Sequence, residues 1–286
     1  VIPLGQGMLR LEFDDLHSDT DQYNATIIHC NQNWSKSTLL DLDYLTSYNE
    51  FPINQYEFSI DTHIPYVHYS FNVPGVKLPG NYLLVVYRGT DKNDIILSRR
   101  FMVYENRITF ANERNLIGAG SVAAVNQQIN FTVNYKNVEI LNPMESVVVT
   151  VRQNQRWDNM ATGIKPSFIR ELQHELEYRF FDERNMFKGS NEFRFFDLRS
   201  VIYPGRNIAT VSKDQKPFTA YVVRDKSRGH EAYAQYLDLN GNYIINNLDY
   251  NNESAANYLN VVFTLTSPEP VGDAVYVTGA FNHWNL

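Results

Sequence analysis

The sequence contains a single cysteine, Cys30, among 286 residues, so no disulfide can form within the chain. It has no run of lysine and arginine and carries a net charge of −7, which argues against nucleic acid or an anionic membrane surface as a partner. No apolar stretch approaches the roughly 20 residues that a transmembrane helix needs. With 43% hydrophobic and 20% charged residues, the composition is that of a folded globular protein.

The motifs of common catalytic and metal sites are also missing. There is no Gly-x-Ser-x-Gly nucleophile turn and no phosphate-binding glycine loop. The seven histidines are scattered, without the helical or clustered spacing of metal ligands. Cys30 lies among apolar strand residues, which favours a buried side chain over a reactive thiolate. We therefore expect no enzymatic activity, no cofactor and no metal site.

Aromatic side chains are abundant: 19 Tyr and 17 Phe contribute to an aromatic fraction of 14%. These residues suit pleated surfaces, so the composition favours β-structure. Segment 39–48 has apolar residues at helical spacing over barely two turns, which predicts a short helix or an irregular crossover. Elsewhere before residue 105, apolar and polar residues alternate with the period of two that indicates strands. The strands predicted there cover residues 8–13, 23–30, 66–73, 81–88 and 95–104, with a hairpin turn at 89–94.

A second series of strands follows a pause in the pattern at Glu105 and Asn106. Segment 168–180 is ambiguous, because its apolar residues fit both a helix and a strand, and the β-rich context favours the strand. Asn240-Gly241 predicts a hairpin turn, since both residue types accept a positive φ. The other strands predicted in this part cover residues 107–111, 128–135, 146–153, 192–201, 207–211, 218–224, 233–239, 243–247 and 258–265.

These patterns predict an all-β fold of tandem immunoglobulin-like β-sandwich domains, followed by the first strand of a further E-set-like domain. The predicted domains are an N-terminal sandwich (1–105), a second sandwich (106–267) and the start of a truncated third domain (268–286). A lone strand in 273–286 cannot bury its own face, so either this tail pairs with the second domain or the natural chain continues.

The most regular run in the chain is 188–200, where a Gly-Ser-Asn turn leads into alternating charged and aromatic residues. The alternation predicts a strand, and the doubled aromatic at Phe195-Phe196 requires a bulge or a strand covered on both faces. Two interpretations stay open. Either the aromatic side chains pack a core while the charges pair on the strand face, or the run is a recognition surface rich in Phe and Arg. The residues concerned are Asn191, Glu192, Phe193, Arg194, Phe195, Asp197 and Arg199.

The run from Asn191 to Ser200 closely resembles the signature of the plug proteins of the type IX secretion system of Bacteroidetes. The resemblance covers nearly the whole chain in collinear order, and it adds Trp157 to the residues of structural or interaction importance. Other blocks that agree with the family include Asn49-Glu50, Arg99-Arg100-Phe101 and Arg156-Trp157-Asp158.

The resemblance implies a non-enzymatic protein of the periplasm, associated with the outer membrane, that plugs the periplasmic mouth of the translocon barrel. The implied mechanism is steric and reversible and needs no cofactor. The expected partner is that outer-membrane barrel, and the acidic net charge favours a basic patch on it. Because the sequence begins at Val1 rather than Met, we expect a mature or trimmed product whose signal peptide is not included.

The tail supports an alternative of another class, carbohydrate binding. The segment from Val277 to Trp284 resembles the opening of glycogen- and starch-binding β-sandwich modules, where a strand ends in Gly-x-Phe-Asn-x-Trp. An exposed ring of Phe281 or Trp284 would suit the face of a sugar. The simpler interpretation is that both rings pack the end of the strand and its turn.

Overall fold

The computed structural model describes residues 1–112, 126–154, 156–189, 193–228, 239–250, 252–267, 270–272 and 274–284. Strands arranged in several sheets predominate among them, which confirms the predicted all-β, β-sandwich fold class. The chain forms two compact units: unit 1 comprises 1–106, 197–221 and 246–262, and unit 2 comprises 107–196, 222–245 and 263–286. The polypeptide therefore passes from one unit to the other five times. The domain boundaries predicted from the sequence, at 105/106 and 267/268, separate parts that we expect to fold independently. These boundaries stay a prediction.

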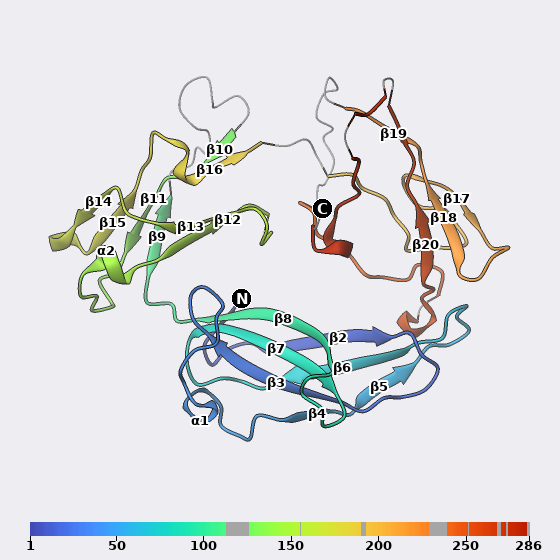
Figure 1. The fold of residues 1–286 in the computed structure, drawn as a ribbon, viewed down its shortest axis with the longest axis horizontal. Helices are drawn as coiled ribbons and strands as arrows, with labels where there is room; N and C mark the ends of the chain where they lie inside the picture. The colour runs from blue at the N-terminus through green and yellow to red at the C-terminus, as the bar shows by residue number, and fades with distance from the viewer. Residues whose placement is uncertain are drawn as a thin grey trace. The chain divides into compact units, whose positions relative to one another are not determined.

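The first 105 residues contain two layers of β-sheet (Figure 1). One layer is antiparallel with the order β2-β6-β5. The other follows the order β1-β8-β7-β3-β4 and is antiparallel except for the pair β1-β8. The strands are β1 (Ile2–Pro3), β2 (Leu9–Asp15), β3 (Tyr23–Cys30), β4 (Phe51–Ile53), β5 (Gln55–Phe58), β6 (Val67–Val73), β7 (Gly80–Arg88) and β8 (Ile95–Tyr104).

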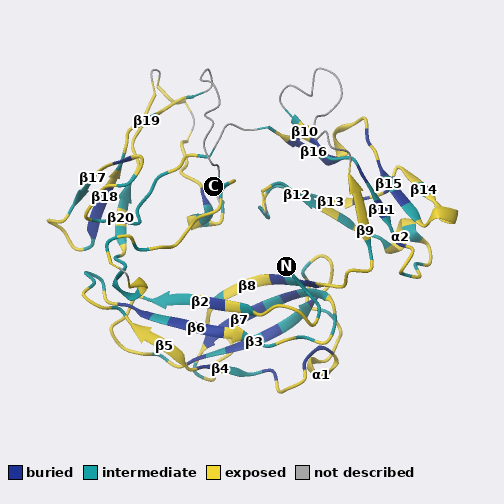
Figure 2. Cartoon of the chain, turned by 180° about the vertical axis from the view of Figure 1, so that it is seen from behind, coloured by how far each residue is buried: buried dark blue, intermediate teal, exposed yellow. Residues whose placement is uncertain are grey.

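Alternate residues of both layers fill the core of this sandwich, as the period of two predicts. Tyr69 of β6 has no exposed surface; its ring stacks on Phe13 at 5.2 Å and meets Tyr23 edge-on at 4.9 Å. The hydroxyl of Tyr69 accepts a hydrogen bond from Asp21 N at 2.9 Å and donates one to Asp21 O at 3.1 Å. An aromatic core is thus closed without leaving this polar atom unpaired. The dark blue stretches of β3, β6 and β7 in Figure 2 belong to this buried face.

The crossover after β3 contains the short helix α1 (Asp41–Tyr44), which confirms the helical alternative for segment 39–48. Tyr44 is buried, and its hydroxyl donates to the main-chain oxygen of Ile27 at 2.9 Å. The side chain of Asn49 binds the same residue twice, accepting from Ile27 N at 2.9 Å and donating to Ile27 O at 2.8 Å. These bonds hold the crossover against β3.

Unit 1 also contains a three-stranded sheet with the order β17-β18-β20, in which β18 and β20 are parallel. The ring centroid of Phe218 in β18 lies 3.7 Å from that of His63 in the first sandwich. The elements are β17 (Ile208–Ser212), β18 (Phe218–Val222), the 3-10 turn η4 (Glu253–Ala255) and β20 (Leu259–Val262).

In unit 2, a four-stranded sheet with the order β14-β15-β11-β9 packs on the pair β12-β13. Phe131 and Tyr178 are cross-strand partners in its core, with ring centroids stacked at 4.7 Å. The elements are β9 (Thr109–Asn112), β10 (Asn126–Gln128), β11 (Phe131–Asn134), α2 (Pro143–Ser146), β12 (Val149–Arg152), β13 (Met160–Ile164), β14 (Phe168–Arg170), η2 (Glu171–Gln173), β15 (Glu175–Tyr178), η3 (Glu183–Asn185), β16 (Met186–Lys188), β19 (Asp225–Lys226), β21 (Leu265–Thr266) and η5 (Ala280–Asn282).

Some segments differ from the strands predicted for them. Segment 168–180 is a hairpin of β14 and β15 around η2, because the chain reverses at His174 with a φ of 57°. The described residues of 192–201 form no strand; their main chain bonds to loops instead, as Asp197 N does to Arg206 O. Segment 243–247 also forms no strand, although the predicted turn before it is present.

The sequence also predicts a strand in the tail and another at 233–239. In the described part of 268–286, where the sequence predicts a first strand, the structure has the 3-10 turn η5. A hydrogen bond from Gly279 N to the side chain of Asn282 at 2.8 Å closes this turn. The strand predicted at 233–239 lies, apart from Leu239, outside the described residues.

Candidate functional site

The described residues bring no three His, Cys, Asp or Glu side chains together in a group that could hold a metal ion. Nor do they include a helix whose length and apolar character would let it cross a membrane. Two regions concentrate polar and aromatic contacts instead. One is the signature segment around 193–200, and the other is the outer face of the sheet β2-β6-β5.

Local hydrogen bonds fix the polar half of the signature segment. The Arg199 guanidinium donates to both carboxylate oxygens of Asp197, at 2.9 and 2.7 Å. Ser200 Oγ and the main-chain N–H of Val201 both donate to the carboxylate of Asp249. The hydrogen bonds from Arg199 lower the pKa of Asp197 below its ordinary value, although burial acts in the opposite direction. The pair is therefore ionised near neutral pH and stabilises the loop.

The aromatic half of the signature meets the tail. The ring of Phe193 lies edge-on to Trp284, with centroids 5.3 Å apart. The guanidinium of Arg156 lies 4.3 Å from the centroid of Trp284. At Gly241, with a φ of 78°, an added Cβ would stand 2.9 Å from Trp284 and 3.1 Å from Phe193. The structure thus gathers residues that are distant in sequence into one aromatic contact.

The remaining signature residues do not share one surface. Arg194 is exposed and forms an ion pair with Asp225 at 3.1 Å. Phe195 is 42% exposed, whereas Phe196 is half-buried and meets Phe263 edge-on at 5.4 Å. Asn191 and Glu192 lie outside the described residues.

Trp157 and the tail aromatics occupy different environments. The guanidinium of Arg152 lies 3.8 Å from the ring centroid of Trp157. Phe281 is 62% exposed, and its ring stacks with Phe263 at 6.1 Å. Trp284 is half-buried between Phe193 and Arg156, so less of its ring is open to a ligand than that of Phe281.

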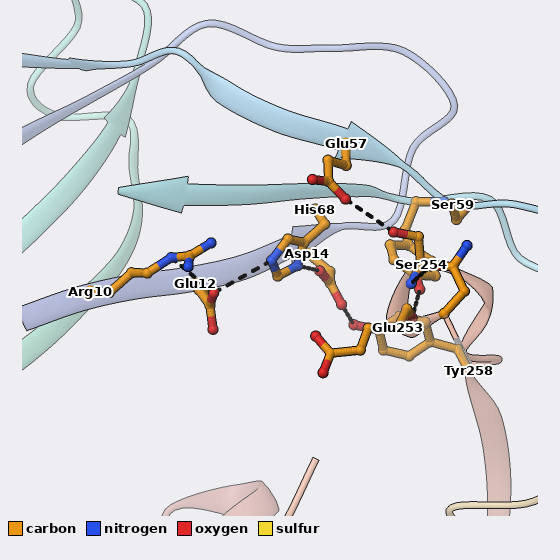
Figure 3. Close-up of polar contacts among 11 residues, drawn as sticks. Arg10, Glu12, Asp14, Glu57, Ser59, His68, Glu253, Ser254 and Tyr258 are labelled. Atoms are coloured by element: carbon orange, nitrogen blue, oxygen red, sulfur yellow. Dashed lines mark hydrogen bonds and ion pairs between the residues drawn. The ribbon is translucent and has the colours of Figure 1, made fainter. Parts of the chain in front are cut away.

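On the outer face of β2-β6-β5, acidic side chains surround one histidine (Figure 3). The strand register places His68 between Asp14 of β2 and Glu57 of β5. Nδ1 of His68 is 2.6 Å from Asp14, and its Nε2 is 3.9 Å from Glu12. Arg10 binds Glu12 at 3.0 Å. Three carboxylates therefore face one arginine and one histidine, and the face is anionic.

A segment from late in the chain binds this face within unit 1 (Figure 3). Tyr258 donates its hydroxyl hydrogen to Asp14 at 2.6 Å, across 244 residues of sequence. Ser254 Oγ donates to Glu57 at 3.2 Å, and Ser254 O accepts from Ile60 N at 2.8 Å. We call residues 253–258 the clasp.

The chemistry of this region is binding rather than proton transfer. Burial and the hydrogen bond to Asp14 raise the pKa of Tyr258 above its ordinary value, so the hydroxyl stays protonated and acts as a donor. The ring of Tyr258 meets Tyr66 edge-on at 5.4 Å, which adds apolar contact. Sequence reasoning missed this region, because neither Asp14 nor Tyr258 belongs to a motif and no local pattern links residues so far apart.

Comparison with known proteins bears on both the fold and the family. Residues 1–105 match the family model of the type 9 secretion system plug protein 1st domain. The crystal structure of a hypothetical protein from Parabacteroides merdae ATCC 43184 is similar over 99% of this chain and 72% of its own chain, with a TM-score of 0.89 and 26% sequence identity. No curated protein matches the chain. The resemblance predicted from the sequence is confirmed by the match of residues 1–105 to the first domain of the type 9 secretion system plug proteins.

Proposed function

We propose that this protein is a non-enzymatic component of the periplasm that plugs the periplasmic mouth of the outer-membrane translocon barrel in type IX secretion. The match of residues 1–105 to a plug domain carries the proposal. The partner is the barrel itself, and the location is the periplasmic side of the outer membrane. No cofactor takes part.

The proposed action is steric, so the protein must keep its shape while it occupies the barrel. Close-packed interiors have low compressibility. The first sandwich has such an interior, in which Tyr69 and Tyr82 have no exposed surface. The clasp adds hydrogen bonds to Asp14 and Glu57 that connect distant parts of unit 1. These features suit a body that blocks a pore without changing its own fold.

Charge complementarity supports a basic contact surface on the barrel. The chain carries a net charge of −7, and Glu12, Asp14 and Glu57 share one sheet face. Interactions between exposed charges weaken as salt shortens the Debye length, from about 10 Å at 0.1 M to about 3 Å at 1 M. Binding of the barrel should therefore become weaker with rising salt, mainly through a slower association rate.

The test measures the conductance of the barrel. The purified translocon barrel is inserted in a planar lipid bilayer, and the protein is added to the side that corresponds to the periplasm. The plug proposal expects a stepwise fall in conductance that washing reverses. An acidic protein of similar size serves as the control for non-specific block. Unchanged conductance with folded protein, together with no co-purification of the barrel from outer membranes, rules the proposal out.

A second candidate, carbohydrate binding, is favoured by one observation, the 62% exposure of Phe281. A ring of this kind can stack on a sugar. Affinity electrophoresis in gels with soluble glucans tests it, and Phe281→Ala is the matched variant. A band that runs equally fast with and without glucan excludes this function. Retardation that Phe281→Ala abolishes supports it.

A further inference from the structure

The sheet β2-β6-β5 has two edges of different character. At β2, Leu9 and Phe13 are half-buried, Leu11 is buried, and the exposed side chains of Arg10 and Glu12 form an ion pair at 3.0 Å. Charged side chains on an edge strand oppose pairing with another strand. At β5 all four residues, Gln55–Phe58, are exposed. No strand among the described residues pairs with the outer edge of β5.

The hydrogen-bond pattern shows which main-chain groups of β5 point outward. Pairs in an antiparallel ladder alternate between bonded and non-bonded. Ser59 N donates to Tyr66 O at 2.9 Å, directly beyond the registered pair Phe58↔Val67. Because bonded positions recur at every second residue before Ser59, Glu57 and Gln55 also bond to β6. The N–H and C=O groups of Tyr56 and Phe58 therefore point away from β6.

The chain itself uses the next group in this outward series. Ile60 follows Tyr56 and Phe58 at the same period of two, and its N–H donates to the main-chain oxygen of Ser254 at 2.8 Å. One end of the edge thus already accepts a main-chain partner from the clasp. Tyr56 and Phe58 continue the same row of donors and acceptors, which is a template for strand addition.

The side chains along this edge alternate in chemistry. Tyr56 and Phe58 are 48% and 51% exposed, and their ring centroids lie 5.8 Å apart. Register places them opposite Tyr69 and Val67, on the core side of the sheet. Glu57 projects to the other face, where Figure 3 shows its carboxylate beside the clasp.

We propose that the outer edge of β5 binds an extended strand of a partner polypeptide in which apolar residues alternate with lysine or arginine. The main chain of the partner pairs with Tyr56 and Phe58, and its apolar side chains lie beside their rings. Its cationic side chains lie on the face that carries Glu57, the carboxylate of the neighbouring strand, since cross-strand neighbours of opposite charge attract and like charges repel. The proposal goes beyond the plug function and does not depend on it.

The probe is a fluorescein-labelled peptide of eight residues in which lysine alternates with valine, titrated with the full chain by fluorescence anisotropy. We expect saturable binding that weakens at least tenfold when glutamate replaces lysine. Two further peptides carry N-methyl groups on all lysines or on all valines. Only one set of amides can face β5, so one methylated peptide should lose binding and the other should keep it. Equal binding of both overturns the proposal.

Variants of the protein locate the site. Tyr56→Pro removes the outward N–H without removing a ladder bond to β6, and it should weaken peptide binding at least tenfold. Tyr56→Ser keeps the N–H and is the matched control, with a smaller loss. Glu57→Lys should reverse the preference, so that the glutamate peptide binds better than the lysine peptide. Unchanged binding by Tyr56→Pro, or an unchanged preference in Glu57→Lys, contradicts the proposal.

Hydrogen exchange of the unmodified protein decides the matter if Tyr56→Pro fails to fold. Saturating lysine-valine peptide should slow deuterium uptake at the amides of Tyr56 and Phe58. The outward edge of β2 provides the internal control and should be unaffected. Unchanged uptake at β5 with bound peptide overturns the proposal, because the peptide then sits elsewhere.

Discussion

The contact between Asn49 and Ile27 provides a sharp test of how the crossover is held against β3. Ile27 has no exposed surface, and the carboxamide of Asn49 is the acceptor that pairs its N–H. Replacing Asn49 with Ala leaves this N–H buried and unpaired. An unsatisfied buried group costs about 1–3 kcal/mol, so we expect that loss of unfolding free energy.

The carbonyl oxygen of Ile27 should respond differently, because it has two donors. Asn49 donates to it at 2.8 Å and Tyr44 at 2.9 Å, although the Tyr44 hydroxyl also lies 2.7 Å from Asp41. Tyr44→Phe alone should therefore cost about 1 kcal/mol or less. In the double variant the carbonyl loses both donors, so the total loss should exceed the sum of the single losses by about 1 kcal/mol.

Urea unfolding followed by circular dichroism measures these losses, provided that the slope m is the same in all variants. Asn24→Ala is the matched control. The side chain of Asn24 donates to Gly89 O at 2.7 Å, but both residues are half-buried, so water can replace the bond at little cost. Equal losses for Asn49→Ala and Asn24→Ala, or strictly additive losses in the double variant, would refute the reasoning.

Three further variants probe the signature segment. Phe193→Ala removes an edge-on ring contact at a half-buried position, so we expect about 1–2 kcal/mol in urea unfolding rather than the ~3–5 kcal/mol of a fully buried ring; a loss below about 0.5 kcal/mol contradicts this packing. Gly205→Ala brings a Cβ to 2.5 Å from the carbonyl oxygen of Asp197 and should lower Tm, whereas Gly75→Ala, with nothing within 4 Å, should not; equal Tm values contradict the clash. Asp197→Asn tests the low pKa of that carboxyl. Its ionised form stabilises the fold above the unfolded pKa of about 3.9, and this stabilisation is lost as pH falls through the lower folded pKa. Acid should therefore lower the Tm of the variant less steeply than that of the parent. The same fall of Tm with falling pH in both proteins would argue against the effect.

Strands whose buried face shows as an alternation of apolar residues within the strand itself could be predicted well. The bounds of β3 and β8 agree with the sequence prediction, because each apolar face is visible in the alternation itself. The sequence predicts that aromatic side chains fill the core, but not which rings contact each other. That Tyr69 meets Tyr23 and that its hydroxyl pairs with Asp21 depends on residues that the pattern does not connect.

In segment 168–180 the period of two is present, but the single strand predicted from it is wrong, because the segment forms a hairpin of two strands. Two short antiparallel strands have the same alternation as one long strand, so the period does not reveal where the chain turns. The turn depends on His174, whose φ of 57° is uncommon for a residue other than glycine. No residue of the usual turn types marks that position.

The signature segment resists prediction for a different reason, which also bears on its two interpretations. The chain passes from unit 2 to unit 1 between Phe196 and Asp197, at the end of the doubled aromatic. The residues before this point contact unit 2, as Phe193 does with Trp284, and those after it contact unit 1, as Ser200 does with Asp249. A single strand would bind one sheet along its whole length, whereas this run must bind two sets of neighbours. We infer that packing accounts for the ends of the signature. The recognition interpretation narrows to its exposed middle, where Phe195 is 42% exposed.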